Sequence, residues 1–574
     1  MLRMARKCHQ VLAVLEEPII QGFLVLGRFS WYKSLISLGR IIAARTMLLS
    51  NLFSSFFFSA AAAQVATLNV AIPSTAPSSA SAISPDQLSF SIEQDRWTDW
   101  AGATTRNQFL FNVLENLATL AGEPPRIRIG ADSEDHTDFQ PGLQVVEETF
   151  AAPSPATPYP EASHIIVGDA FYRAAQNLPS GTHVTWGVNF KSDNITAAFL
   201  EARAIAQAFS SFPSSSGLVL DAVEIGNEAD LYVNDGNRPS NFTIAVYVPQ
   251  WASFATNVSA TVPISPSTSI KFWGGAFAGS SHTTTGFSPQ GLFANGILST
   301  TPGKQINTIS QHLYSGSGQG CTTAITTCIQ NLMSKANVRG NLSTLIPDIA
   351  ATKAQGLTYV LGETNSYFGH GAPNVSHSAG SALWALDYTF FATELGIQRV
   401  YFHEGVGYKY NFIQPVTLNV SITDGTPLAN PLPPHVQPAY YGAIVAAEAV
   451  GNGGSRIAEI SVGSATVSGH AIFTSNGQLS KAVFINSQGF FTGTTTSRPS
   501  THLNLSFSGK APSSMTVKRL VIGHADDTSG LTWGGQTYET TDGKVGGTLS
   551  VTTSSVSAGI DIPASQAVLV TFTS

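Results

Sequence analysis

The chain has 574 residues, of which 29 are Lys or Arg and 36 are Asp or Glu, so its formal net charge is −7. Charged residues make up 11% of the chain, well below the roughly 25% of average globular proteins, and 43% of the residues are apolar. This composition excludes a disordered polyelectrolyte, and without a basic stripe we expect no nucleic-acid partner.

Residues 47–63 have the pattern of a secretion signal. They follow Arg40 and Arg45 and end in four alanines at 60–63, which are small residues suited to cleavage. We therefore expect Met47 to be the true start, residues 1–46 to be a gene-model extension, and the mature chain to be secreted and extracellular, with no membrane partner. A membrane anchor over residues 20–63 is the alternative, although the apolar segment is short and interrupted by serines.

Residues 64–85 form a lead rich in Pro, Ser and Ala with one expected strand, at 65–72. Over residues 86–425, β-rich runs alternate with helical patterns, which are clearest at 107–120, after a cap at Asp193, and at 378–395. The expected strands are 88–92, 126–129, 183–188, 218–225, 270–273, 306–311, 358–361 and 398–402. Eight strands with crossovers predict an α/β fold, a (β/α)8 TIM barrel. An open doubly wound sheet is the alternative, but no Gly-rich phosphate loop follows an early strand.

Residues 426–574 are dense in Gly, Ser and Thr and carry short alternating runs. These runs lie at 457–462, 482–486, 503–507, 514–522, 548–552 and 567–573. Their spacing predicts a C-terminal antiparallel β-sandwich domain, and we expect the strand at 65–72 to join it.

Cysteines and glycosylation motifs agree with export. Cys8 lies in the segment that we expect to be removed, which leaves Cys321 and Cys328 to form a disulfide in an oxidising compartment. No zinc constellation is completed by histidines, so we expect neither a metal nor a cofactor.

Glycans attached at Asn-x-Ser/Thr sequons would hydrate a surface poor in charge. The Asn-x-Ser/Thr sequons lie at Asn194, Asn241, Asn257, Asn341, Asn374, Asn419 and Asn504.

Two glutamates follow the carboxyl ends of the expected fourth and seventh strands. Glu228 ends the run Val223-Glu-Ile-Gly-Asn-Glu228, and Glu363 ends Val360-Leu-Gly-Glu363. Because all strand ends of a parallel barrel face one rim, both side chains reach the same mouth. Glycosidic cleavage needs such a pair, one acid for the leaving oxygen and one carboxylate that attacks the anomeric carbon or activates water.

Neighbouring residues favour this chemistry over the alternative of two solvated loop charges. Asn227 directly precedes Glu228 and can bind a sugar 2-hydroxyl, and His312 and Tyr314 end the sixth strand, where they can orient a carboxylate. Trp273, at the end of the fifth strand, is either part of the core or a platform for a sugar face.

These motifs resemble the clan A glycoside hydrolases and, more closely, glycoside hydrolase family 79, the β-glucuronidase and heparanase family, in its secreted fungal members. The resemblance rests on Ser91-Ile-Glu-Gln-Asp-Arg-Trp97, Arg128-Ile-Gly-Ala-Asp-Ser133, Glu224-Ile-Gly-Asn-Glu228 and Leu361-Gly-Glu-Thr-Asn365. It implies that Glu228 is the general acid/base and Glu363 the nucleophile of a retaining double displacement. It also implies that Asp132 binds sugar hydroxyls and that Tyr367, Tyr408 and the amide of Gly407 bind a uronate carboxylate.

The charge distribution bears on the substrate. A heparanase-like endo-β-glucuronidase needs clustered basic residues along its cleft, whereas here the 29 basic residues are scattered. We therefore expect a monomeric exo-enzyme that releases terminal β-D-glucuronic acid, or its 4-O-methyl form, from oligo- or polysaccharides such as arabinogalactan side chains. The alternatives are the endo-enzyme and a catalytically silent carbohydrate-binding wall protein on the same scaffold.

Overall fold

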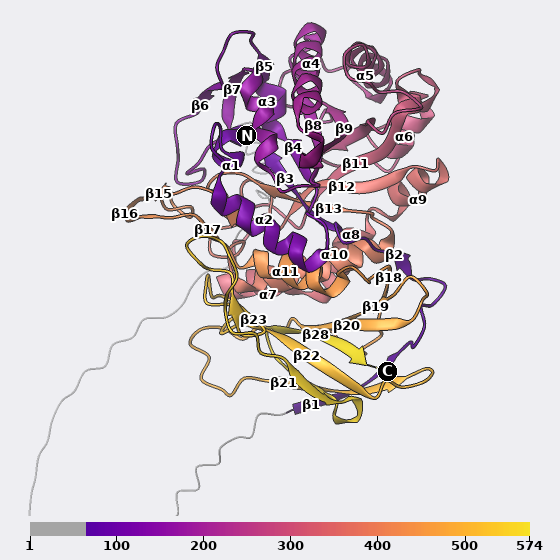
Figure 1. Ribbon diagram of the computed structural model, residues 1–574, viewed down its shortest axis with the longest axis vertical. Coiled ribbons are helices and arrows are strands. Elements are labelled where there is room, and N and C mark those ends of the chain that lie inside the picture. The colour runs from indigo at the N-terminus through magenta and orange to yellow at the C-terminus, as the bar shows by residue number, and fades with distance from the viewer. Residues whose placement is uncertain (1–64, 319, 574) are drawn as a thin grey trace, which may run out of the picture. The chain divides into compact units, whose positions relative to one another are not determined.

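The computed structural model describes residues 65–318 and 320–573, so Cys8, the expected extension and the expected signal peptide lie outside the described residues. A closed barrel of eight parallel strands forms the first half of the fold (Figure 1). In ring order its strands are β3 (Leu88–Glu93), β4 (Ile127–Gly130), β8 (His183–Val188), β9 (Val219–Ile225), β10 (Lys271–Phe277), β11 (Ile306–Tyr314), β12 (Thr358–Asn365) and β13 (Val400–Glu404). The closure of the ring confirms the predicted barrel and excludes the open sheet.

The barrel strands are buried on both faces, as β3 and β13 show at every position. Helices cover the outer face and side chains fill the interior, so these strands read as apolar runs with no clean alternation. Their buried polar positions, such as Glu93 and Glu404, gather toward the carboxyl ends. The strands therefore extend past several of the ends that hydropathy alone predicts.

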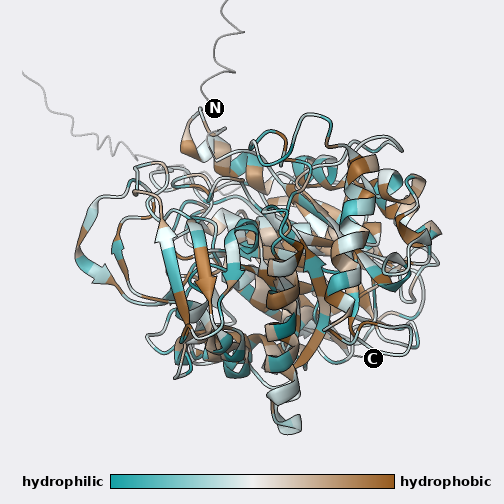
Figure 2. Ribbon diagram, turned by 90° about the horizontal axis from the view of Figure 1, so that it is seen from above, coloured by the Kyte–Doolittle hydropathy of each residue, from teal (hydrophilic) through white to brown (hydrophobic). Residues whose placement is uncertain are grey.

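The helices around the barrel carry both brown and teal segments in Figure 2, as expected of helices that bury one face. The predicted helices are α2 (Gln108–Ala121), α4 (Ile195–Ser211) and α10 (Ala379–Leu395). The cap predicted at Asp193 is wrong: Asn194 caps α4 by accepting a hydrogen bond from the Ala197 amide, and Asp193 lies before it in a left-handed conformation. The remaining helices are α1 (Trp97–Ala101), α3 (Asp169–Arg173), α5 (Ile244–Ser259), α6 (Pro289–Ala294), α7 (Ile325–Met333), α8 (Lys335–Ser343), α9 (Ile346–Ala354) and α11 (Ala439–Val450).

Helix α11 completes the helical layer of the barrel. It follows β13 and packs against α10 and α2, which flank the first and last strands. The layer thus continues beyond residue 425, where we expected the barrel to end. Three small sheets lie in the loops. The first consists of β5 (Thr137–Phe139), β6 (Val146–Phe150) and β7 (Ala162–Val167), the second of β15 (Leu418–Val420) and β16 (Pro427–Leu432), and the third of β14 (Ile413–Gln414) and β17 (His435–Val436).

The C-terminal part consists of two facing sheets. In the smaller sheet β1 (Val65–Ile72) pairs in parallel with β21 (Ser500–Phe507), which pairs with β27 (Ile560–Pro563). The larger sheet has the order β2 (Ser81–Ala82), β18 (Arg456–Glu459), β19 (Val467–Phe473), β20 (Leu479–Asn486), β28 (Gln566–Thr573), β22 (Ser514–Val521), β23 (Thr532–Trp533), β24 (Gln536–Thr537) and β25 (Gly546–Gly547), with β26 (Thr552–Ser555) beside β22. The strand at 65–72 therefore does join the C-terminal sheets.

Sequence patterns missed β19 and misplaced one strand. β19 is buried at every position, because one face packs on the smaller sheet and the other on barrel helices, so it shows no alternation. The strand predicted at 548–552 is wrong for most of its length, since β26 begins only at Thr552 and the residues before it are exposed.

The predicted disulfide is present: Cys321 and Cys328 are bonded, with their Cα atoms 5.8 Å apart. Of the sequon asparagines, Asn257 and Asn341 are half-buried and the other five are exposed. Within residues 65–318 and 320–573, no helix combines the length and the apolar character that crossing a membrane requires.

Candidate active site

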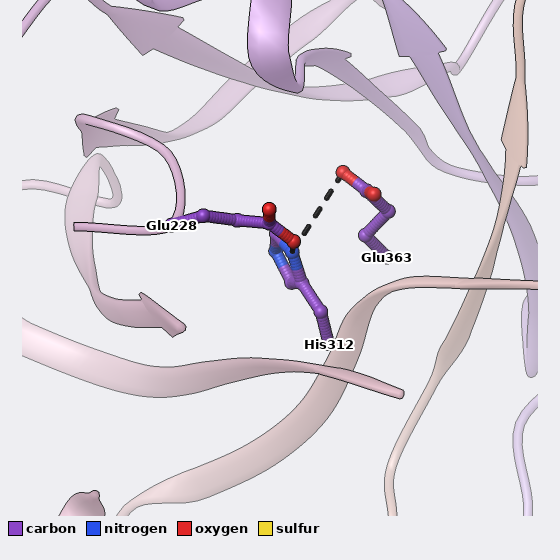
Figure 3. A group of neighbouring side chains, drawn as sticks. All are labelled: Glu228, His312 and Glu363. Carbon is purple, nitrogen blue, oxygen red and sulfur yellow. Dashed lines mark hydrogen bonds and ion pairs between the residues drawn. The ribbon is translucent and has the colours of Figure 1, made fainter. Parts of the chain in front are cut away.

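The structure brings Glu228 and Glu363 together at the carboxyl ends of the barrel strands. Figure 3 shows the two side chains approaching from different sides, with His312 beside them. One carboxylate oxygen of each glutamate and one nitrogen of His312 lie within 4.8 Å of one another. Glu363 belongs to β12, whereas Glu228 lies beyond β9 in a left-handed conformation (φ 49°), anchored by its amide, which donates to the Ala276 carbonyl at 2.7 Å. A backbone strained in this way is common where a side chain must be aimed at a reacting centre.

Glu363 is surrounded by donors and cations. Arg128 donates to its Oε2 at 3.0 Å, and the Tyr314 hydroxyl donates to its Oε1 at 2.7 Å. Burial alone would raise the pKa of Glu363, but His403, His312, Arg128 and the Tyr314 hydrogen bond together hold that pKa well below its ordinary value. Glu363 is therefore ionised across the range in which proteins work.

Arg128 organises the floor of this site. The fully buried guanidinium pairs with Glu224, at 2.6 Å from Nη2, and with Glu363. It also donates to the Ser91 hydroxyl at 2.9 Å and to Asn227 Oδ1 at 2.8 Å. The side-chain oxygen of Asn227 is thus held inside, which leaves its amide nitrogen as the donor for a ligand.

Glu228 is in the opposite protonation state. Burial, followed by the negative charges of Glu363 and Asp132, raises its pKa well above the ordinary value, against a smaller opposing effect of Arg128. His312 Nδ1 lies 2.9 Å from Glu228 Oε1, and burial lowers the pKa of His312 to about 4. A neutral imidazole therefore faces a protonated carboxyl group, and the pair of glutamates shares one negative charge.

Sequence reasoning missed a second layer, although its residues lie at strand ends and in the loop after β13. Glu93, at the end of β3, binds His403 Nε2 at 3.0 Å and the Ser133 amide at 3.1 Å. Burial, with the charges of Glu161, Asp132 and Glu363, raises the pKa of Glu93 well above normal. The strand-end rule that found Glu363 applies equally to Glu93 and to His403 on β13.

Asp132 lies at the rim, on the short 3-10 helix Asp132–His136. Its carboxylate contacts His136 Nε2 at 3.2 Å and Lys191 Nζ at 3.5 Å, and 42% of its side chain remains exposed. The residue is thus oriented by His136 and Lys191 and accessible to a hydroxyl.

The residues expected to hold a uronate already have partners or neighbours within the protein. The Tyr408 hydroxyl donates to Glu161 at 2.9 Å, and its ring stacks on His370 with centroids 3.9 Å apart. The Gly407 amide differs from the expectation, because it already donates to Gln414 Oε1 at 3.0 Å and is not free for a ligand. Tyr367 lines a separate cavity beside α8.

Trp273 belongs to the core, so a role as a sugar platform is wrong. Its ring packs edge-on against Tyr401, 5.2 Å between centroids, in a cluster with Ala222 and Val360. It lines a small cavity with Arg126 and residues from the amino ends of β11 and β12. The strand continues four residues beyond it, which places Trp273 below the mouth.

Glu228, His312 and Glu363 are also the one group in the described part of the chain whose spacing could suit a metal ion. Metal ligands must be deprotonated, whereas Glu228 has a raised pKa, so this group fits acid–base chemistry better than metal binding.

Comparison with known proteins finds that the chain is similar to glycoside-cleaving enzymes. Residues 469–569 match the glycosyl hydrolase family 79 C-terminal β domain. A β-glucuronidase of Aspergillus niger is 29% identical over 514 residues, which cover 84% of this chain and 90% of that protein. A β-glucuronidase of Neurospora crassa is 25% identical over 516 residues, covering 82% and 87% respectively.

Solved structures share the fold. A 4-O-α-L-rhamnosyl-β-D-glucuronidase from Fusarium oxysporum superposes with a TM-score of 0.71 at 24% identity, covering 88% of this chain and all of that one. A family 51 arabinofuranosidase from Xanthomonas axonopodis has a TM-score of 0.56 at 12% identity, with 89% of this chain and all of the other covered.

Proposed function

The chain is a member of glycoside hydrolase family 79, and on that premise we propose that it is a secreted, retaining exo-β-glucuronidase. It releases terminal β-D-glucuronic acid, or its 4-O-methyl form, from glycans such as arabinogalactan side chains. The observation that carries this proposal is the adjacent pair of carboxyl groups, with one oxygen of Glu228 and one of Glu363 within 4.8 Å of each other, in surroundings that raise the pKa of Glu228 and lower that of Glu363.

The first step uses this difference directly. Glu363 attacks the anomeric carbon while Glu228 gives its proton to the leaving oxygen, so a glycosyl ester forms on Glu363 and the aglycone leaves as an alcohol. Arg128 and Tyr314 hold the carboxylate that attacks, and the Asn227 amide nitrogen is placed to bind the sugar 2-hydroxyl.

The second step follows from the loss of charge. Once Glu363 is esterified, it no longer repels a negative charge on Glu228, so the pKa of Glu228 falls and its carboxylate can accept a proton from water. That water attacks the anomeric carbon and frees Glu363. The separation supports retention, because oxygens within 4.8 Å match the roughly 5–5.5 Å of retaining pairs and leave no room for the about 6.5–9.5 Å of inverting pairs.

Exo-action is supported by the state of the basic groups near the mouth. Lys191 is shared between Asp132 and Asp235, both at 3.5 Å. Lys409 is only 2% exposed and donates to the Ala156 carbonyl. Neither is free to bind a sulfated polymer, which a heparanase-like enzyme would have to hold.

For the sugar carboxylate we propose Tyr408 with His370. Both side chains contact one oxygen of Glu161, at 2.9 and 2.8 Å, so together they already bind a carboxylate. A uronate that displaces Glu161 would meet the same two groups.

The test compares hydrolysis of 4-nitrophenyl β-D-glucuronide with that of the glucoside and the xyloside. We expect preference for the glucuronide, β-glucuronic acid as the first product by NMR, and loss of turnover in Glu363→Gln. In Glu228→Ala, a substrate with a good leaving group should form the glycosyl-enzyme and then stall, and azide should restore turnover.

Each alternative has its own outcome. Cleavage within heparan sulfate would identify an endo-enzyme. Binding without hydrolysis of any of the three glycosides would favour the carbohydrate-binding wall protein. Substantial turnover by Glu363→Gln would refute the assigned nucleophile.

A further inference from the structure

A second cavity, of about 350 Å³, lies outside the ring of residues that hydrogen-bond to Glu228 and Glu363. It is lined by α7, α8, α10 and the loops after β11 and β12. Its polar and aromatic lining consists of Ser315, Asn331, Asn337, Asn341, Tyr367 and Trp384. Neither catalytic glutamate contributes to it.

Two residues that line this cavity each carry a buried polar atom without a partner in the described part of the chain. Trp384 is 1% exposed, and its indole N–H has no acceptor anywhere in residues 65–318 and 320–573. The side-chain oxygen of Asn341 is buried and has no donor in that same part of the chain. The Asn341 amide nitrogen donates to the Tyr314 carbonyl at 3.0 Å, which fixes the orientation of the amide. Buried donors and acceptors are normally paired, so an unpaired donor and an unpaired acceptor on two residues that line one cavity point to a ligand that can accept one hydrogen bond and donate another.

The lining restricts the class of ligand. Every residue that lines the cavity is uncharged, so nothing there compensates for a carboxylate, a sulfate or an ammonium group. A hydroxyl group both accepts and donates, and the half-buried ring of Tyr367 offers an apolar face. We propose that this cavity binds a neutral sugar residue, as a second carbohydrate site distinct from the one that takes the uronic acid.

The site lies one residue away from the catalytic machinery. Asn341 binds the carbonyl of Tyr314, and the hydroxyl of the same tyrosine donates to Glu363. A glycan whose neutral sugar occupies the cavity is therefore held next to the mouth of the barrel. The proposal does not depend on which sugar the two glutamates cleave.

The proposed sugar site has a consequence for glycosylation of the sequon at Asn341. Asn341 is half-buried on α8 with its amide nitrogen engaged, and a glycan attached there would occupy the cavity itself. We therefore expect the Asn341 peptide of the secreted protein to be unmodified, which peptide mass spectrometry checks.

Binding is measured by saturation-transfer NMR and crystal soaks with methyl β-D-galactopyranoside and methyl β-D-glucopyranoside, and with glucuronate as the charged comparator. The blocking variant is Gly340→Leu, because Gly340 lines the cavity and a Cβ there meets no atom within 4 Å. We expect it to weaken binding of a neutral glycoside at least tenfold and to change kcat/KM for a small aryl glucuronide by less than twofold. Trp384→Phe removes one neutral hydrogen bond and should weaken binding about fivefold.

The matched control is Ala354→Leu on the exposed end of α9, which should leave binding unchanged. Glu363→Gln should bind the neutral glycosides as the wild type does, so failure of the proposed enzymatic function and failure of this site are distinguishable. The proposal is overturned by absence of saturable binding of both glycosides, by unchanged affinity in Gly340→Leu, or by a glycan on Asn341.

Discussion

Glu228 and Glu363 are the same residue type at equivalent ends of two strands, and their surroundings assign them different roles. The Arg128 guanidinium and the Tyr314 hydroxyl both donate to Glu363 and stabilise its negative charge, whereas Glu228 faces Glu363 itself and the neutral imidazole of His312. A nucleophile must be ionised and a general acid protonated, so the electrostatics alone distinguish the two functions.

Arg128→Lys tests this separation. A lysine keeps one charge but loses the fork that reaches Glu224, Glu363 and Asn227 at once, so the pKa of Glu363 should rise toward its ordinary value. Because a group with a depressed pKa loses its charge only at low pH, raising that pKa moves the acid limb of kcat/KM to higher pH. We expect kcat/KM to fall about 100-fold at its optimum, by analogy with the loss of one preorganised donor.

The pH profile of hydrolysis, measured for both proteins, checks this expectation. The alkaline limb, which reports loss of the Glu228 proton, should lie above the ordinary range of a glutamate in the wild type. An unchanged acid limb in Arg128→Lys would show that the guanidinium does not control the charge of Glu363.

At the scale of elements, α10 and β19 are joined by buried charge. His470 on β19 binds Asp387 and Glu394 on α10, at 2.9 and 2.8 Å, and Arg339 on α8 binds Asp387 from the other side. Burial alone would lower the pKa of His470, but the two carboxylates raise it to about 9. The imidazolium therefore ties the larger sheet of the C-terminal part to the barrel helices.

His470→Gln should lower the free energy of unfolding by about 3–5 kcal/mol at pH 6, because it leaves buried carboxylates without their cation. The folded pKa lies above the unfolded value of about 6.5, so this contribution is fully present below that value. It is lost as the pH rises toward 9. The difference between the two proteins, from denaturant unfolding at several pH values, should therefore shrink between pH 6.5 and 9.

His502→Gln serves as the control, since His502 pairs with the largely exposed Asp561. Such a pair contributes about 0–1 kcal/mol. Equal effects of the two substitutions would contradict the assigned role of His470.

At the scale of the whole molecule, the first and last described strands belong to the same pair of sheets. β1 pairs with β21, and the side chains of Val70 and Ile72 are fully buried between the two sheets. Folding of the C-terminal part therefore requires a strand that ends at Ile72, before the barrel begins at Leu88, as well as strands beyond residue 450.

Val70→Ala and Val65→Ala form a matched pair on this strand. Val70 is fully buried, so Val70→Ala should lower the free energy of unfolding by about 2 kcal/mol, because apolar groups are lost and a space is left behind. Val65 is 50% exposed, so Val65→Ala should lower the free energy of unfolding by less than about 0.5 kcal/mol. Thermal unfolding of both variants checks this, and equal melting temperatures would show that β1 contributes little to the fold.

Much of the architecture follows from local patterns. The eight barrel strands, α2 and α10 are apparent as apolar runs and helical faces, because burial imposes a period on the chain. The pair Glu228 and Glu363, with His312 and Tyr314, was predictable because the carboxyl ends of parallel strands must meet at one rim. The bonded pair Cys321–Cys328 follows from the few cysteines of the chain.

Other features depend on contacts between distant segments. β19 shows no alternation because it is covered on both faces, and the burial of Trp273 depends on its neighbour Tyr401. Whether the Gly407 amide is free for a ligand is decided by Gln414, which accepts its hydrogen bond.

The sequence by itself determined the barrel, its two glutamates and the low charge that argues against a polyanionic substrate. Only the tertiary structure decided the protonation of those glutamates, since a pKa depends on which charges are brought within a few ångströms. It also revealed the uncharged cavity at Asn341 and Trp384, because an unpaired buried donor or acceptor exists only once the surrounding chain has excluded water.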